Sequence, residues 1–130
     1  MIVYVDTSVV AKTLIDEVDS GAAVAALDRY GEIGRLFSSS IAITELRRAA
    51  SRAGVDVAIT RDALRRLSLV QVDDELLESA GELPGLSLRS LDAIHIASAM
   101  SIDANVFVTA DIRQAVAARG AGLDVIDQFA

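Results

Sequence analysis

Four acidic residues from well-separated parts of the chain have the chemistry to bind a divalent cation: Asp6, Glu45, Asp92 and Asp111. The chain has no cysteine and a single histidine, His95, so neither a thiolate site nor a multi-histidine site can form within one chain. Carboxylate oxygens are the ligands that Mg²⁺ and Mn²⁺ prefer. The residue types therefore predict an oxygen-ligated Mg²⁺ site, in which Mn²⁺ could substitute.

Asp6 and Asp111 each have a structural alternative, because both stand directly before a predicted helix. A carboxylate in that position can cap the helix by accepting a backbone N–H. Beside Asp6, either Thr7 or Ser8 could perform the capping and leave the carboxylate free for a metal. For Asp111, capping and metal binding both stay open.

Glu45 and Asp92 lie inside predicted helices. Glu45 borders an apolar helix stripe, and an ion pair with Arg48 is its structural alternative. Asp92 lies in the first turn of a helix that is apolar nearly all round, and a buried carboxylate is costly unless it is capped, paired or metal-bound. Its alternative is stabilisation by the helix dipole. His95, one turn further on, is expected to be a core histidine bonded to backbone rather than a catalytic base.

Short β-branched runs alternate with helix-period segments along the whole chain. The predicted strands span residues 2–5, 36–38, 69–72, 106–109 and 123–126, and the predicted helices span 8–17, 20–30, 41–53, 57–67, 74–83, 91–102 and 112–119. This alternation predicts one α/β domain, residues 1–130, with a five-stranded parallel sheet flanked by helices. Ligand sites in such sheets lie where strands end and helices begin. Asp6, Asp92 and Asp111 are expected at that edge, with Glu45 within reach from its helix.

The composition sets limits on location and partners. Hydrophobic residues make up 52% of the chain and aromatic ones only 4%, which suits helices packed on a short aliphatic sheet. No apolar run is long enough to cross a membrane and the first residues do not resemble a secretion signal, so we expect a cytosolic protein with no membrane partner. The net charge of −7 argues against broad nucleic-acid affinity.

A nucleic-acid substrate would therefore have to be held locally, by metal and by arginines. All but one of the 12 basic residues are arginine, the side chain best suited to phosphate. Six of them crowd into one stretch, for which solvated helix faces are the alternative interpretation: Arg47, Arg48, Arg52, Arg61, Arg65 and Arg66.

The order and spacing of these segments resemble the PIN-domain ribonucleases, and specifically the VapC-type toxins of type II toxin–antitoxin pairs. The resemblance covers essentially the whole chain. It is carried by four segments: Val3-Tyr4-Val5-Asp6-Thr7-Ser8, Ser40 to Glu45-Leu46-Arg47-Arg48, Leu91-Asp92-Ala93-Ile94-His95-Ile96-Ala97, and Val108-Thr109-Ala110-Asp111.

This resemblance implies a three-layer PIN fold and Mg²⁺-dependent hydrolysis of RNA phosphodiester bonds. The catalytic, metal-binding acids would be Asp6, Glu45, Asp92 and Asp111, with Thr7 (or Ser8) and Thr109 as supporting polar groups. Phosphodiester hydrolysis needs an activated water and charge neutralisation, which one or two Mg²⁺ ions held by four acids can supply. We expect Asp6 and Asp92 to be the primary ligands. The resemblance further implies a homodimer and a small antitoxin protein that blocks the site, a partner that the acidic surface would suit.

Other functions fit the sequence less well. A haloacid-dehalogenase-like phosphatase would need an acid two residues after Asp6, where Ser8 stands. A phosphoryl-acceptor receiver domain would need a lysine after a late strand, and Lys12 is the only lysine. A PIN-fold binding module without activity is the third alternative, against which the presence of all four acids argues.

Overall fold

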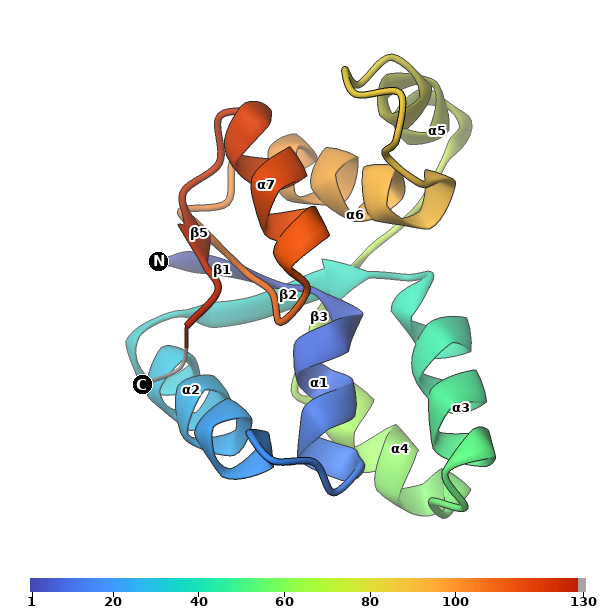
Figure 1. Ribbon diagram of the computed structural model, residues 1–130, viewed down its shortest axis with the longest axis vertical. Coiled ribbons are helices and arrows are strands. Elements are labelled where there is room, and N and C mark those ends of the chain that lie inside the picture. The colour runs from blue at the N-terminus through green and yellow to red at the C-terminus, as the bar shows by residue number, and fades with distance from the viewer. Residues whose placement is uncertain (129–130) are drawn as a thin grey trace.

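A five-stranded, fully parallel sheet forms the middle layer of the molecule (Figure 1), as the computed structural model of residues 1–128 describes it. The strand order is β3-β2-β1-β4-β5. The strands are β1 (Ile2–Val5), β2 (Arg35–Ser39), β3 (Ser68–Val70), β4 (Val106–Val108) and β5 (Val125–Ile126). The predicted α/β fold with a five-stranded parallel sheet is confirmed.

Helices cover both faces of this sheet (Figure 1). One face carries α1 (Thr7–Leu14), α2 (Ser20–Ile33), α3 (Ala42–Arg52) and α4 (Val57–Arg65). The opposite face carries α5 (Asp74–Gly81), α6 (Ser90–Ser101) and α7 (Ile112–Gly120). None of the helices within residues 1–128 is long and apolar enough to cross a membrane.

The side-chain alternation of β1 divides the core into two. Val3 and Val5 belong to the cluster that packs against α1 and α2, while Tyr4, between them, belongs to the cluster formed with α6 and α7. All three side chains are fully buried. Successive strand residues point to opposite faces, and a strand buried on both faces is mainly apolar, which is why this segment has no charged residue before Asp6.

Two helix ends differ most from their predicted positions, by three residues each. The first helix, predicted to run to residue 17, ends at Leu14, because Lys12 there bonds to Glu17 and Asp19 and closes a loop. The second helix, predicted to end at residue 30, continues to Ile33 through Gly31. Gly34 then follows with extended backbone, and a β-carbon added there would lie 2.6 Å from the Met1 carbonyl oxygen. This close approach explains a glycine immediately before β2.

The central strand β1 is flanked by β2 on one side and β4 on the other. The chain adds β2 and β3 on one side of β1 and then crosses over to add β4 and β5 on the other, so the strand order reverses at β1. Val5 is in register with Val108, and the Asp6 N–H donates to the Val108 carbonyl at 2.9 Å. The two strands therefore end side by side, and the residues that follow them are brought together. In parallel sheets, ligands bind at such a switch point, at the carboxyl ends of the strands.

Candidate metal centre

A cleft of about 450 Å³ lies at this switch point and is lined by all four predicted acids: Asp6, Glu45, Asp92 and Asp111. They come from the end of β1, from α3, from the first turn of α6 and from the residue before α7. Thr7, Ser8, Arg48 and Arg52 line the same cleft. The structure therefore brings together the residues that sequence reasoning singled out, although they are far apart in the chain.

Asp6 is the most deeply buried of the four acids, with 6% of its surface exposed. It occupies the N-cap position of α1, but its side chain makes no capping bond. Its Oδ2 instead accepts hydrogen bonds from Ser8 Oγ and Thr109 Oγ1, both at 2.8 Å. The capping alternative for Asp6 is thus wrong. Neither of the other two candidates caps the helix, because the hydroxyl of Ser8 donates to Asp6 and that of Thr7 donates to Glu45.

Burial raises the pKa of Asp6 above its ordinary value of 3.8. The charge of a protonated His95 and the hydrogen bonds from Ser8 and Thr109 lower this pKa, but by less than burial raises it. A carboxylate that the fold places in so unfavourable a position is one that a bound cation would stabilise.

Glu45 is held by two donors on other elements. Its Oε1 accepts from Thr7 Oγ1 at 2.9 Å and lies 2.6 Å from His95 Nε2. The alternative ion pair with Arg48 is not among those formed within residues 1–128. Glu45 therefore points from α3 across the cleft, fixed between α1 and α6.

His95 links this cleft to the core. It is 1% exposed, its Nδ1 lies 2.7 Å from the Tyr4 hydroxyl, and its Nε2 lies 3.7 Å from Asp6 Oδ1 as well as close to Glu45. The expectation of a buried histidine is confirmed, but the expected bonds to backbone are wrong. Its partners are side chains that only the packing of α6 on β1 and α3 brings together.

The hydrogen-bond partners of His95 determine which ring nitrogen carries a hydrogen and in which direction its pKa shifts. An ionised Glu45 can only accept, so Nε2 carries a hydrogen, and in the neutral ring Nδ1 accepts from the Tyr4 hydroxyl. Burial lowers the pKa of His95, but the hydrogen bond to Glu45 and the negative charges of Asp6, Glu45 and Asp92 outweigh it, and the net pKa is raised above 6.5. Burial likewise raises the pKa of Tyr4, which keeps its hydroxyl neutral.

Asp92 differs from the first two acids. It is half-buried, and its carboxylate forms no hydrogen bond or ion pair with any residue in 1–128; only its backbone carbonyl is engaged, by Gln114 Nε2 at 3.0 Å. Burial raises its pKa, and the negative charges of Asp6 and Asp111 raise it further. The predicted burial of α6 is confirmed, but Asp92 itself faces the cleft.

Asp111 is exposed and does cap its helix. Its Oδ1 accepts from the backbone N–H of Arg113 at 2.9 Å and of Gln114 at 3.4 Å. The capping interpretation is therefore right for this residue. It does not remove Asp111 from the cleft, because a carboxylate has a second oxygen and Asp111 lines the same space as the other three acids.

Tyr4 is the residue of this network that sequence reasoning passed over. Its ring stacks on Phe107 of β4 at 5.3 Å between centroids, and its hydroxyl positions His95. The signal was present, since Tyr4 is the one polar-tipped side chain in an otherwise aliphatic strand. A buried tyrosine hydroxyl usually finds a hydrogen-bond partner, and His95 is that partner here.

The donor set fits a hard divalent cation. Four carboxylates line the cleft, and the charges of Asp6 and Asp111 already act on Asp92. Within residues 1–128, no three acidic or histidine side chains are placed so that they could form a cage around one metal ion. Mg²⁺ does not require such a cage, because it commonly takes one or two carboxylates and keeps several waters.

Comparison with known proteins assigns the family. The PIN domain family matches residues 3–120. Ribonuclease VapC46 of Mycobacterium tuberculosis (strain ATCC 25618 / H37Rv) is 36% identical over 128 residues, 95% of each chain. Ribonuclease VapC35 of the same species (strain CDC 1551 / Oshkosh) is 32% identical over 129 residues, again 95% of each chain.

The fold agrees with this assignment. The crystal structure of VapBC2 from Rickettsia felis bound to a DNA fragment from their promoter matches with a TM-score of 0.73 at 20% identity, covering 97% of this chain and 98% of that one. The match over nearly the whole length, the two relatives above 30% identity and the cleft at the sheet switch point lead to one conclusion: the chain belongs to the PIN-domain family and, within it, to the VapC proteins.

Proposed function

We propose that this protein is a Mg²⁺-dependent ribonuclease that hydrolyses RNA phosphodiester bonds and acts as the toxin of a toxin–antitoxin pair. The observation that carries the proposal is the convergence of four carboxylates from four separate elements on one cleft. The curated relatives VapC46 and VapC35 are named ribonucleases, which favours RNA hydrolysis over the phosphatase-like alternative.

The four acids would hold the ion, with Asp6 and Asp92 as primary ligands and Glu45 and Asp111 completing the site. A divalent ion bound there supplies charge neutralisation at the phosphate and lowers the pKa of water. The chain's own contribution is geometry: Ser8 and Thr109 fix the carboxylate of Asp6. Thr7 and His95 fix that of Glu45, so this half of the site is oriented before substrate arrives.

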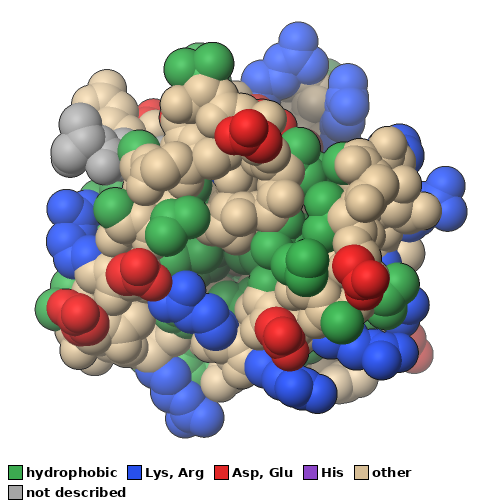
Figure 2. Space-filling view, turned by 90° about the horizontal axis from the view of Figure 1, so that it is seen from below, with side chains coloured by type: hydrophobic (Ala, Val, Ile, Leu, Met, Phe, Trp, Pro, Cys, Tyr) green, Lys and Arg blue, Asp and Glu red, His purple; other side chains and the backbone are tan. Residues whose placement is uncertain are grey.

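Substrate affinity has to come from local positive charge, since the net charge is −7. Figure 2 shows acidic and basic side chains mixed with apolar ones on the underside of the molecule, without a continuous basic patch. Arg48 and Arg52, however, both line the carboxylate cleft from α3. Of the six clustered arginines, Arg65 and Arg66 instead pair with Asp62 and Asp28. Arg48 and Arg52 are therefore the two arginines of the cluster that are placed to contact a substrate in the cleft.

Cleavage of a labelled RNA pool by the purified, partner-free protein tests the proposal. We expect cleavage with Mg²⁺ or Mn²⁺ and none with EDTA. Asp6→Asn and Asp92→Asn should each lower the rate at least about a hundredfold, because loss of a metal ligand removes several kcal/mol of transition-state stabilisation. Asp16→Asn, an exposed acid outside the cleft, is the matched control. A folded wild-type chain that cuts no RNA would mean a binding module instead.

Metal binding has its own test, which does not depend on activity. Because the metal-free carboxylates repel one another, millimolar Mg²⁺ should raise the melting temperature of the wild-type chain. The increase should be reduced in Asp92→Asn and unchanged in Asp16→Asn. An equal increase in all three proteins would place the ion elsewhere.

The proposal includes a small antitoxin that blocks the cleft and a homodimeric toxin. The solved relative is a VapBC2 assembly, which supports a partner of the VapB kind. Induction of this chain alone should slow growth, and co-expression of a short open reading frame adjoining its gene should restore it. Light scattering of the purified chain, with twice the monomer mass of 13.7 kDa expected, tests the dimer.

A further inference from the structure

A second depression, of about 600 Å³, adjoins the carboxylate cleft between the loop that precedes α6 and the outer face of α7. We call it the α6–α7 groove. Asp92 and Asp111 line both the groove and the cleft, so the two spaces adjoin at these residues. A ligand bound in the groove would therefore lie beside the proposed metal centre.

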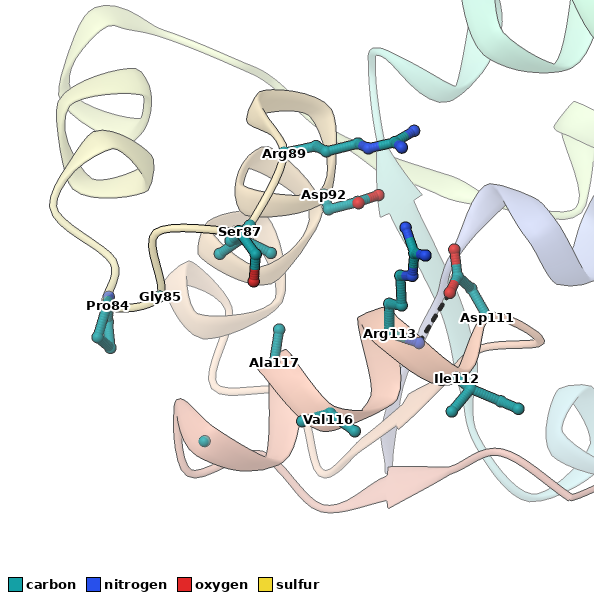
Figure 3. Close-up of a pocket in the computed structure, with 12 residues that line it drawn as sticks. Pro84, Gly85, Ser87, Arg89, Asp92, Asp111, Ile112, Arg113, Val116 and Ala117 are labelled. Atoms are coloured by element: carbon teal, nitrogen blue, oxygen red, sulfur yellow. Dashed lines mark hydrogen bonds between the residues drawn. The ribbon is translucent and has the colours of Figure 1, made fainter.

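Two arginines stand at the end of the groove next to these acids. Arg89 precedes α6 and Arg113 lies in the first turn of α7, and both are exposed. Figure 3 shows their side chains extending toward the side on which Asp92 and Asp111 lie. Neither arginine takes part in an ion pair within residues 1–128, whereas Arg65, Arg66 and Arg119 do. The two guanidinium groups are therefore available to a ligand.

The rest of the groove is mainly apolar. Leu88 and Val116 form parts of its walls, and Val116 is 65% exposed although it is aliphatic. Ser87 adds a hydroxyl. An apolar wall beside two guanidinium forks suits a ligand with a flat, weakly polar part and an anionic part. A nucleotide has both, in its base and its phosphate.

We propose that the α6–α7 groove is the subsite for the nucleotide next to the cleavage position, with Arg89 and Arg113 binding its phosphate and the base lying against Leu88 and Val116. This inference rests on the proposed ribonuclease function and names the part of the molecule that grips the substrate. It explains how a chain with a net charge of −7 can hold RNA, since phosphates are bound beside the acids rather than across a basic face.

A peptide of a partner protein is the competing occupant, and the charges favour it less. A basic peptide would satisfy Asp92 and Asp111 but leave the two arginines facing positive charge. An acidic peptide would satisfy the arginines but meet the two carboxylates. A phosphodiester that arrives together with a cation complements both pairs at once.

The test measures binding of a fluorescent single-stranded RNA oligonucleotide by anisotropy over a range of salt concentrations. An Asp6→Asn background, with Mg²⁺ present, prevents cleavage during the measurement. Arg89→Ala/Arg113→Ala should weaken binding roughly tenfold or more, because charge-assisted hydrogen bonds are removed. The slope of log affinity against log salt should fall by about 0.7 for each phosphate that the variant no longer neutralises. Arg61 is an exposed arginine of α4 outside the cleft and the groove, so Arg61→Ala is the charge control. It should change the affinity and the salt slope by less than the double variant does.

A second variant tests the apolar wall. Val116→Glu places a carboxylate in the groove at an exposed position where folding is not at risk, and it should also weaken binding. Val24→Glu, on the exposed side of α2, is its control.

The outcomes separate the two proposals. RNA cleavage by the wild-type chain together with unchanged affinity and salt slope in the double variant would overturn the subsite alone. Absence of both RNA binding and cleavage in the wild-type chain would overturn the ribonuclease proposal. A further outcome uses Arg89→Ala/Arg113→Ala in the chain that keeps Asp6. If RNA affinity and salt slope are unchanged by the two substitutions, but this chain still slows growth and is no longer neutralised by the neighbouring gene's product, the groove binds protein and the subsite is excluded.

Discussion

The two halves of the carboxylate cleft are built differently. Asp6 is held by the hydroxyls of Ser8, two residues further on, and of Thr109. Glu45 is held by Thr7 and His95, and His95 connects it to Tyr4 in the core. The carboxylate of Asp92 has no partner within residues 1–128, and that of Asp111 bonds only to the backbone of its own helix. One half is preorganised by packing, while the other is free to adjust.

This difference indicates that the two pairs of acids have different roles. Held carboxylates keep their positions when no ion is bound, at the cost of burial that raises the pKa of Asp6. The carboxylates of Asp92 and Asp111 are freer to move toward an ion if one binds, and both line the α6–α7 groove as well as the cleft. Substitutions in the held half should therefore disturb folding as well as chemistry, whereas substitutions in the free half should disturb chemistry with a smaller loss of stability.

The largest effect on stability is expected from His95→Ala. The substitution leaves a cavity in the core and removes the partner of the Tyr4 hydroxyl and of Glu45. We expect the free energy of unfolding to fall by about 2–4 kcal/mol, measured by urea denaturation without metal. Asp92→Ala, in the free half, is the comparison and should change it by less than about 1 kcal/mol. An equal loss of unfolding free energy in the two variants would contradict the distinction between a held and a free half.

A smaller effect is expected at Asp111, where the structural and chemical roles can be separated. Asp111→Ala removes the α7 cap and should cost about 1 kcal/mol of stability. Asp111→Asn keeps an acceptor for the backbone N–H groups and should leave stability nearly unchanged while it removes one negative charge from the cleft. Cleavage should fall in both variants. Full activity in Asp111→Asn would show that Asp111 is a cap and nothing more.

The most gradual effect is expected from pH in the metal-free protein. Asp6 and Asp92 have folded-state pKa values raised above 3.8, so the folded chain binds more protons than the unfolded one and loses stability as the pH rises through those values. His95, with its pKa raised above 6.5, stabilises the fold fully below 6.5, and that contribution is lost as the pH rises through its folded pKa. Urea unfolding in EDTA across this range should show declining stability above pH 6.5.

The control for this measurement is His95→Gln, which keeps an N–H donor but cannot titrate. In this variant the decline above pH 6.5 should be smaller. If the wild-type chain and His95→Gln gave the same profile, the histidine would have no part in the pH dependence.

The sheet and its helices were largely predictable, because strand and helix periodicities are local properties of the sequence. β1, predicted at residues 2–5, agrees at both ends. The helix ends were less predictable: Lys12 closes the loop after Leu14 by bonding to acids five and seven residues further on, which periodicity does not record.

The residue inventory by itself limited the kind of metal site that the chain could form. Without cysteine and with one histidine, the chain can offer a metal ion mainly oxygen ligands, whatever its fold. The identity of the four acids likewise followed from their positions after strands and from the family resemblance.

Only the tertiary structure decided which groups each acid contacts. Asp6 and Asp111 occupy the same local position before a helix, yet one bonds to Thr109, 103 residues away, and the other caps its own helix. The partners of His95 and the groove beside Arg89 and Arg113 were likewise not predictable from the sequence. Such contacts depend on how distant elements pack, and the free energy of packing is a property of the whole core rather than of any short segment.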